Sequence, residues 1–210
     1  MTPTPSGDTR TALTSRAGII VNYRTGATVL LTGDALSRWL TAVQNSPAPP
    51  PVTIAESAPS WGTDENTARL DHLPTPPWAW RISATACLLI TLAVRHAGSP
   101  ASKFGRMARL AETGHRLPRA RTAHARAAVL SIRWAARAIP ARVACLEEST
   151  AASLLLAVGR RGGAWRHGIA ADPIRLHAWI CDAQEQPVEE PERTKRYTPI
   201  NVPNPTGTRT

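Results

Sequence analysis

The sequence predicts an α+β protein in which a helical part packs on a small antiparallel sheet, preceded by a short β-hairpin and helix. Two observations predict this class. Residues 78–158 contain apolar and amphipathic runs at helical spacing, separated by Gly and Pro. Residues 164–200 contain short runs of β-forming residues with turn signals between them. Helices followed by an antiparallel meander are typical of an α+β domain.

The N-terminal part is predicted to hold a tail and a small structured segment. Residues 1–15 are rich in Thr, Pro and Ser, and we expect them to be disordered. Residues 16–45 contain two β-branched runs around a turn at residues 24–26, which indicates a hairpin, and then a short helix. The apolar side chains of this helix share one face: Leu36, Trp39, Leu40 and Val43. Prolines within residues 46–77 indicate a linker.

The main domain is predicted to span residues 78–204, with a second tail at residues 205–210. Gly and Pro divide its first half into helices at residues 78–97, 103–114, 120–138 and 145–158. Its second half is expected to form strands at residues 164–170, 173–181, 186–190 and 196–200.

Composition restricts the class of protein. The chain has 25 Lys and Arg against 15 Asp and Glu, a formal net charge of +10. Such a charge suits a polyanion, but it equally suits an acidic peptide partner. The three cysteines form no CxxC pair, which argues against a disulfide scaffold or a zinc knuckle. The N-terminus lacks the apolar region of a signal peptide, and residues 82–94 are too short an apolar run to span a membrane. We therefore expect a protein of the reducing cytoplasm without a membrane span.

His177 lies inside an apolar run, where a histidine is more often a buried core residue than a functional one. Side-chain alternation along a strand places it on the same face as Arg175, Trp179 and Cys181, opposite the more apolar face. This mixture is expected where a strand borders a cleft. We therefore predict a cleft at His177, with Trp179 and Trp165 flanking it and lining a substrate channel.

Cys145 opens the predicted helix at residues 145–158. Unpaired backbone N–H groups and the helix dipole favour a thiolate at this position. The same N–H groups could hold the oxyanion that forms when a thiolate attacks a peptide carbonyl. Glu147 and Glu148 would oppose thiolate formation if they pointed inward, so we expect them to face solvent. The alternative is that Cys145 is a small buried residue at a helix start, and the local sequence leaves both interpretations open.

An acidic residue after the strand could complete a Cys–His–acid arrangement. If residues 180–188 form a tight hairpin with Ala183 and Gln184 at its tip, Glu190 lies directly across from His177. A slip of one residue in this register would present Glu189 instead, because side chains alternate along a strand. Either carboxylate could orient the imidazole.

Five short segments, CLEES, GGAWRHGI, PIRLHAWI, PVEEP and YTPINVP, occur in this order. Together they resemble the B protein of lasso-peptide biosynthesis, a family of cysteine peptidases with a transglutaminase-like or papain-like core. The resemblance covers roughly residues 106–203. It implies that Cys145 is the nucleophile, His177 the general base and acid, and Glu190 the acidic member, although the family commonly has aspartate there.

The same resemblance implies the substrate and the partners. The enzyme would remove the leader from a ribosomally made precursor peptide. It would then pass the core peptide to an ATP-dependent macrolactam synthetase that resembles asparagine synthetase. The chemistry needs no cofactor and no metal.

Residues 18–43 resemble the opening of the PqqD-like leader-recognition domain, a small winged-helix module. In that module a leader segment adds as an extra strand to an exposed sheet edge. The later helices of the module are not evident before the proline-rich stretch. They could come from residues 61–72 or from a separate leader-recognition protein, and the alternative is a hairpin that packs without a ligand.

Two rival classes of site receive less support. A zinc site is disfavoured because His177 and Cys181 lie about 13 Å apart on a strand that rises about 3.3 Å per residue. The alternative to an enzyme is a non-catalytic basic module that binds nucleic acid or leader peptide. Its arginines, however, are spread along the helices without the pattern of a recognition helix: Arg109, Arg116, Arg126, Arg133 and Arg137.

Overall fold

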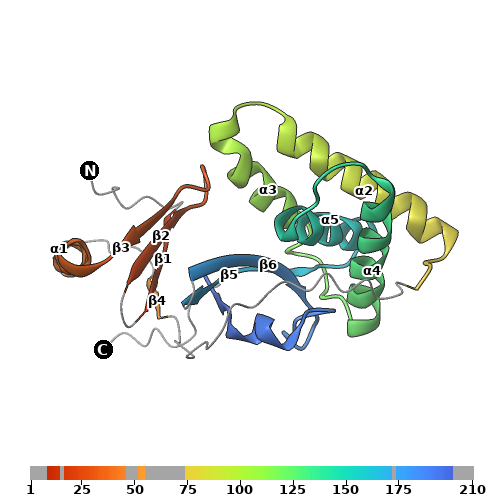
Figure 1. The fold of residues 1–210 in the computed structure, drawn as a ribbon. Helices are drawn as coiled ribbons and strands as arrows, with labels where there is room; N and C mark the ends of the chain where they lie inside the picture. The colour runs from red at the N-terminus through yellow and green to blue at the C-terminus, as the bar shows by residue number, and fades with distance from the viewer. Residues whose placement is uncertain (1–8, 15–16, 46–51, 55–73, 172–173, 201–210) are drawn as a thin grey trace.

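The computed structural model of the protein describes residues 9–14, 17–45, 52–54, 74–171 and 174–200. It contains an N-terminal sheet with one helix, a group of four helices, and a second sheet beneath that group (Figure 1). The class is therefore α+β, as the order of elements in the sequence predicts.

The N-terminal sheet has the strand order β3-β2-β1-β4. Its elements are β1 (Thr9–Leu13), β2 (Gly18–Asn22), β3 (Thr28–Leu31), α1 (Gly33–Gln44) and β4 (Val52–Ile54). Strands β1, β2 and β3 pair antiparallel, and β4 pairs with β1 in parallel. The predicted hairpin and helix are present. In α1, Trp39 is buried, and Leu36, Leu40 and Val43 pack with it against the sheet.

Strand β1 lies within the residues that we expected to be disordered, so this part of the prediction is wrong for residues 9–13. Composition alone suggested a polar tail. The Thr-rich run of β1 nevertheless suits a pleated surface, and β2 supplies its hydrogen-bonding partner along the whole strand. Strand β4 lies in the predicted linker. Residues 61–72, considered as a source of further helices, lie outside the described residues.

The helical group surrounds α5, which carries Cys145 at its first position. Its elements are α2 (Trp78–His96), the short 3₁₀ helix η1 (Pro100–Ser102), α3 (Lys103–Ala111), α4 (Thr122–Ala138) and α5 (Cys145–Val158). Helix α5 contacts α2, α3, α4 and strand β6 (Figure 1). Beyond Glu147 and Glu148 in its first turn, its side chains are apolar or small on all sides, as expected for a helix that is buried on most sides. The N-terminus of α5 is thereby fixed relative to the second sheet.

The second sheet has the order β6-β5-β7 and is antiparallel. Its elements are β5 (Ala164–Ala171), β6 (Ile174–Cys181), the 3₁₀ helix η2 (Glu192–Arg196) and β7 (Thr198–Pro199). Side chains of β6 alternate as predicted. Ala178 and Ile180 enter the main core under the helices, whereas Trp179 and Cys181 pack with Tyr197 on the other face.

The strand predicted at residues 186–190 is absent. A single isolated bridge pairs Cys181 with Pro187, and the chain then leaves the ladder. Pro187 has no N–H to donate, and Glu189 adopts a left-handed conformation with φ of 55°. Both features end strand pairing before it reaches His177.

The N-terminal sheet is joined to the rest of the protein through a shared apolar cluster. Ile19 and Val21 of β2 pack in it with Ile169 of β5 and Ile200. The turn between β2 and β3 also contacts α3, where the N–H of Gly105 donates to the carbonyl of Arg24 at 3.2 Å. At Gly26 in this turn, φ is +77° and an added Cβ would lie 2.8 Å from Cβ of Phe104. A side chain at this position would therefore disturb the contact.

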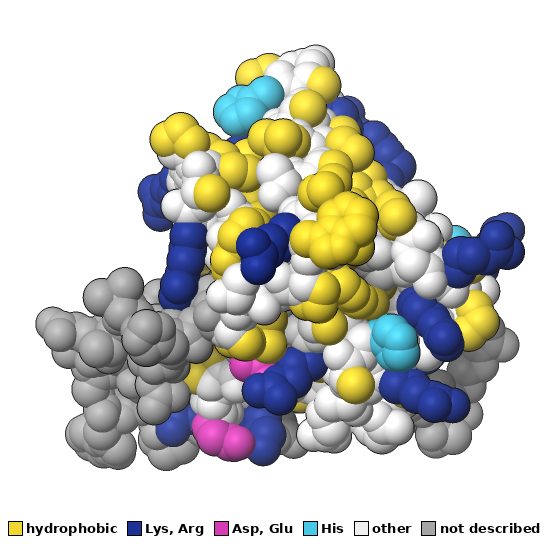
Figure 2. Space-filling view, turned by 90° about the vertical axis from the view of Figure 1, so that its right-hand side faces the viewer, with side chains coloured by type: hydrophobic (Ala, Val, Ile, Leu, Met, Phe, Trp, Pro, Cys, Tyr) yellow, Lys and Arg dark blue, Asp and Glu magenta, His cyan; other side chains and the backbone are white. Residues whose placement is uncertain are grey.

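The outward face of α2 is exposed and apolar. Trp78 is 73% exposed, and Ile82, Leu89 and Ile90 are exposed as well. Val158 at the end of α5 is also exposed. Figure 2 shows apolar side chains gathered in a band on this side of the molecule, with Lys and Arg side chains along its margins. No Asp or Glu occurs in residues 74–111. Within the described part of the chain, no helix has the length and apolar character needed to cross a membrane.

Candidate active site

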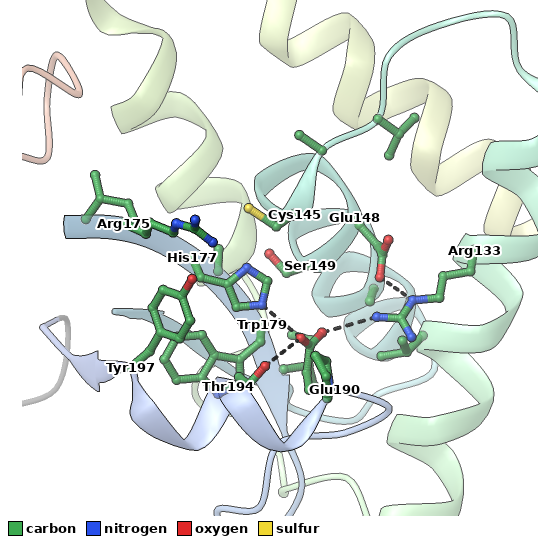
Figure 3. Close-up of a pocket in the computed structure, with 18 of the residues that line it drawn as sticks. Arg133, Cys145, Glu148, Ser149, Arg175, His177, Trp179, Glu190, Thr194 and Tyr197 are labelled. Carbon is green, nitrogen blue, oxygen red and sulfur yellow. Dashed lines mark hydrogen bonds and ion pairs between the residues drawn. The ribbon is translucent and has the colours of Figure 1, made fainter. Parts of the chain in front are cut away.

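Cys145 is the first residue of α5, and its half-buried side chain borders a cavity of about 840 Å³. His177, from the middle of β6, lines the same cavity, and its imidazole lies next to the thiol of Cys145 (Figure 3). The main core fixes both elements, because α5 packs directly on the apolar face of β6. A helix start and a strand far apart in sequence thus bring a thiol to an imidazole.

The thiol and the imidazole are electrostatically coupled. Burial raises the pKa of the Cys145 thiol, but a hydrogen bond with His177, the N–H of Ala178 and the charge of His177 together bring that pKa below its ordinary value. Burial lowers the pKa of His177, but hydrogen bonds with Cys145 and Glu190 and their charges raise it to about 9. Both shifts favour a thiolate–imidazolium pair over the neutral pair.

Glu190 lies on the other side of the imidazole from Cys145 (Figure 3). Nε2 of His177 is 2.8 Å from Oε2 of Glu190, and the hydroxyl of Thr194 donates to the same oxygen at 3.1 Å. The ring of His177 packs against both Trp179 and Tyr197, with ring centroids 5.7 and 5.3 Å away, and these two rings also contact each other. These contacts fix the orientation of the imidazole.

The structure brings Glu190 to His177 by a route different from the predicted one. The turn after β6 is one residue longer than the assumed tip at Ala183 and Gln184, because Cys181 pairs with Pro187. A regular continuation of this register would place Glu189 on the face of His177. The left-handed Glu189 instead ends the ladder and turns Glu190 inward.

Arg133 of α4 holds two carboxylates of the cavity at once. Its Nε donates to Oε1 of Glu148 at 2.5 Å, and its Nη2 donates to Oε1 of Glu190 at 3.1 Å. Its Nη1 also donates to the backbone carbonyl of Glu189 at 2.7 Å. Arg133 thereby fixes the segment that carries Glu190 and balances the charge of both carboxylates.

The expectation that Glu147 and Glu148 face solvent is wrong. Glu147 is only 4% exposed; its Oε2 accepts the N–H of Ala144 at 3.1 Å, and its Oε1 pairs with Arg95 at 2.9 Å. Glu148 is half-buried beside Arg133, and burial raises its pKa. Ion pairing with Arg95 and Arg133 lets both carboxylates lie inward at the start of α5.

The two tryptophans expected at the substrate channel occupy different places. Trp179 stacks on His177 and lines the cavity. Trp165 is 4% exposed, lies in the main core, and donates from Nε1 to Oγ of Ser149 at 3.0 Å. Trp165 is not among the residues that line the cavity. Its indole therefore holds α5 at Ser149 and does not border the substrate.

The sequence interpretation missed three residues around His177, namely Arg133, Thr194 and Tyr197. In the sequence, Arg133 is only one of several arginines that are spread along the helices. Its pattern in α4 carries no signal for the site, because its partners lie on other elements. The same holds for Arg126, which pairs with Glu189 at 2.5 Å. Among the described residues, no group of three or more His, Cys, Asp or Glu side chains is arranged to hold a metal ion.

A comparison with protein families gives one match. The family model described as the Transglutaminase-like superfamily matches residues 86–202, which is more than half of the chain. The matched range includes Cys145, His177 and Glu190. No match was found among curated proteins or solved structures.

Proposed function

We propose that this chain, which belongs to the transglutaminase-like superfamily, is a cysteine peptidase that removes the leader from a lasso-peptide precursor. The observation that carries the proposal is the coupled arrangement of Cys145, His177 and Glu190 at the cavity. The order of the five short segments in the sequence supports the assignment to leader removal. The reducing cytoplasm, where the thiol of Cys145 persists, is the compartment that we assign to it.

The geometry supports acyl transfer through a thioester. The thiolate of Cys145 attacks the scissile carbonyl, and the negative charge moves to the carbonyl oxygen beside the N–H groups at the start of α5. His177 then donates its proton to the leaving amine as the thioester forms. Water attacks the thioester after giving a proton to His177, and the thiolate leaves with release of the acid product. Glu190 keeps the imidazole oriented and stabilises its charged form in each step.

The test of the proposal uses a precursor peptide and mass spectrometry. Cys145→Ala should abolish cleavage while the circular dichroism spectrum and thermal transition stay those of the unmodified protein. Cys87→Ala removes a different thiol, buried in the helical core, and serves as the matched control. Cleavage retained by folded Cys145→Ala would end the proposal.

We assign leader recognition to the edge of the N-terminal sheet. Strand β3 is the outer strand of this sheet, and within the described residues it pairs only with β2. Val29 and Leu30 of β3 are exposed. A leader segment could add beside β3 through backbone hydrogen bonds. Hydrogen exchange with added leader peptide should slow at residues 28–31. Unchanged exchange there, with measurable binding, would place the leader elsewhere or with a separate leader-recognition protein.

We further propose that the macrolactam synthetase docks on the outward apolar face of α2. A helix that is apolar all round is normally covered on every side, and the outward face of α2 is uncovered in the described part of the chain. Its surroundings are basic and lack carboxylates in residues 74–111. The matching surface of the partner should therefore be apolar with acidic margins.

A further inference from the structure

The cavity at Cys145 carries more positive than negative charge. Four arginines and two glutamates line it: Arg133, Arg142, Arg175, Arg193, Glu148 and Glu190. Both glutamates are already paired with the guanidinium of Arg133. In the described part of the chain, these two carboxylates therefore do not neutralise Arg142 or Arg175.

Two of these arginines flank the reacting groups from different elements. Arg142 lies in the loop before α5, three residues before Cys145. Arg175 lies on β6, two residues before His177 and on the same face of the strand, and Figure 3 shows it beside the imidazole. Both side chains are exposed. Among the described residues, neither guanidinium forms an ion pair with a carboxylate.

We infer that Arg142 and Arg175 select peptides that carry a carboxylate close to the scissile bond. This inference rests on the proposed function and names the substrate class of the same site. A guanidinium binds a carboxylate through two parallel hydrogen bonds, so it recognises the planar group as well as its charge. Both arginines line the cavity that Cys145 and His177 border, one from the loop before α5 and one from β6, so a peptide bound at Cys145 lies within reach of both.

Such contacts form when the peptide binds and change little during the reaction. They should therefore lower KM and leave kcat nearly unchanged. Exposed ion pairs contribute little free energy, so each arginine should raise kcat/KM by roughly two- to fivefold. This effect should weaken with added salt.

The carboxylate could belong to an acidic side chain or to the C-terminus of the substrate. Quenched fluorogenic peptides that differ by Glu or Gln at one position test the first source. The same peptides with a free or amidated C-terminus test the second. We expect that, in at least one pair, the Glu peptide has a higher kcat/KM than the Gln peptide, or that the peptide with a free C-terminus has a higher kcat/KM than the amidated one.

The variant Arg142→Gln/Arg175→Gln should lose this preference through a higher KM, with kcat retained. Arg109→Gln, an exposed arginine of α3 outside the cavity, is the matched control and should keep the preference. Equal kcat/KM for every pair in the unmodified protein, or an undiminished preference in the double variant, would overturn the inference.

If the proposed peptidase function is wrong, the preference for a carboxylate can still be tested by binding. If the unmodified protein cleaves none of the peptides, the same pairs are measured for binding to Cys145→Ala by fluorescence anisotropy. Tighter binding of the carboxylate-bearing member, lost on Arg142→Gln/Arg175→Gln substitution, supports the inference without cleavage. Equal binding within every pair overturns it.

Discussion

Nε2 of His177 lies 2.8 Å from Oε2 of Glu190, although no strand pairing connects the two residues. Two hydrogen bonds hold the carboxylate of Glu190 instead of strand pairing. The guanidinium of Arg133 donates to Oε1, and the hydroxyl of Thr194 donates to Oε2. The acidic group is thus positioned by α4, which is distant from β6 in sequence, and by η2, which is the next element after β6. This arrangement predicts that activity depends on the carboxylate of Glu190 and not on that of Glu189.

Glu190→Gln should lower kcat/KM by a factor on the order of 10² or more, because the imidazole loses the charge that stabilises its protonated form. Glu189→Gln is the matched control: its carboxylate pairs with the exposed Arg126 and does not touch His177. We expect near-normal activity from this control. Steady-state kinetics on a precursor peptide compare the two variants, and equal losses would show that the acidic role is not specific to Glu190.

Activity should depend on pH through the thiolate–imidazolium pair. The value of kcat/KM should rise as Cys145 ionises, at a pH below the ordinary range of a thiol, and fall as His177 loses its proton near pH 9. In Glu190→Gln the alkaline limb should move to lower pH, because one cause of the raised pKa of His177 is removed. A pH–rate profile for both proteins measures this, and an unmoved alkaline limb would contradict the assignment.

Alkylation should single out Cys145 near neutral pH. Burial raises the pKa of the Cys87 thiol, and burial likewise raises the pKa of Cys181 to about 11, so both remain protonated. The Cys145 thiol has a lowered pKa and borders the cavity. Iodoacetamide followed by peptide mapping should label Cys145 first, and His177→Ala should slow that labelling. Equal rates at the three cysteines would remove the case for an activated thiol.

Local patterns were sufficient to indicate where Cys145 and His177 lie in the fold, but not what surrounds them. The helix start at Cys145 follows from the run of apolar and small residues after it, and the face of His177 follows from strand alternation. The register after β6 was predicted one residue short, because the left-handed conformation of Glu185 and Glu189 has no clear signal in the sequence. Arg133 and Arg95 could not be identified, since their roles depend on contacts between distant elements. Thr194 lies only four residues after Glu190, but its contact depends on the irregular backbone between β6 and η2.

Removing Arg133 should affect both stability and the pH profile. Arg133→Gln leaves Glu148 and Glu190 close together without their shared cation, which should destabilise the fold by about 1–3 kcal/mol. The pKa of Glu148, which Arg133 now lowers, should also rise further, so the cavity loses negative charge and activity should fall on the acid side of the profile. Arg126→Gln, which removes a more exposed ion pair, is the control. If the acid side of the pH–rate profile of Arg133→Gln were unchanged, Arg133 would contribute to stability and not to catalysis.

His167 should make the protein less stable in acid. It is buried, and its Nδ1 lies 2.8 Å from the hydroxyl of Tyr23. Burial, with a smaller contribution from the charge of His177, lowers its pKa to about 4. Because the unfolded chain binds this proton near pH 6.5, the free energy of unfolding should fall as pH decreases from about 6.5 to 4. Urea titrations of the protein and of His167→Gln should show a smaller decline in the variant, and identical declines would exclude His167 as the cause.

The apolar face of α2 should be needed for docking of the synthetase and not for cleavage. Ile82→Glu/Leu89→Glu places two carboxylates on exposed positions, so the free energy of unfolding should change by less than about 1 kcal/mol. These charges would lie against the apolar and acidic surface that we expect on the partner, and co-purification of the coexpressed synthetase should be lost. Arg116→Glu, at an exposed position outside this face, is the charge-matched control. Because the cavity at Cys145 is lined by other elements, precursor cleavage should persist in both variants. Undiminished co-purification with Ile82→Glu/Leu89→Glu would place the partner on another surface.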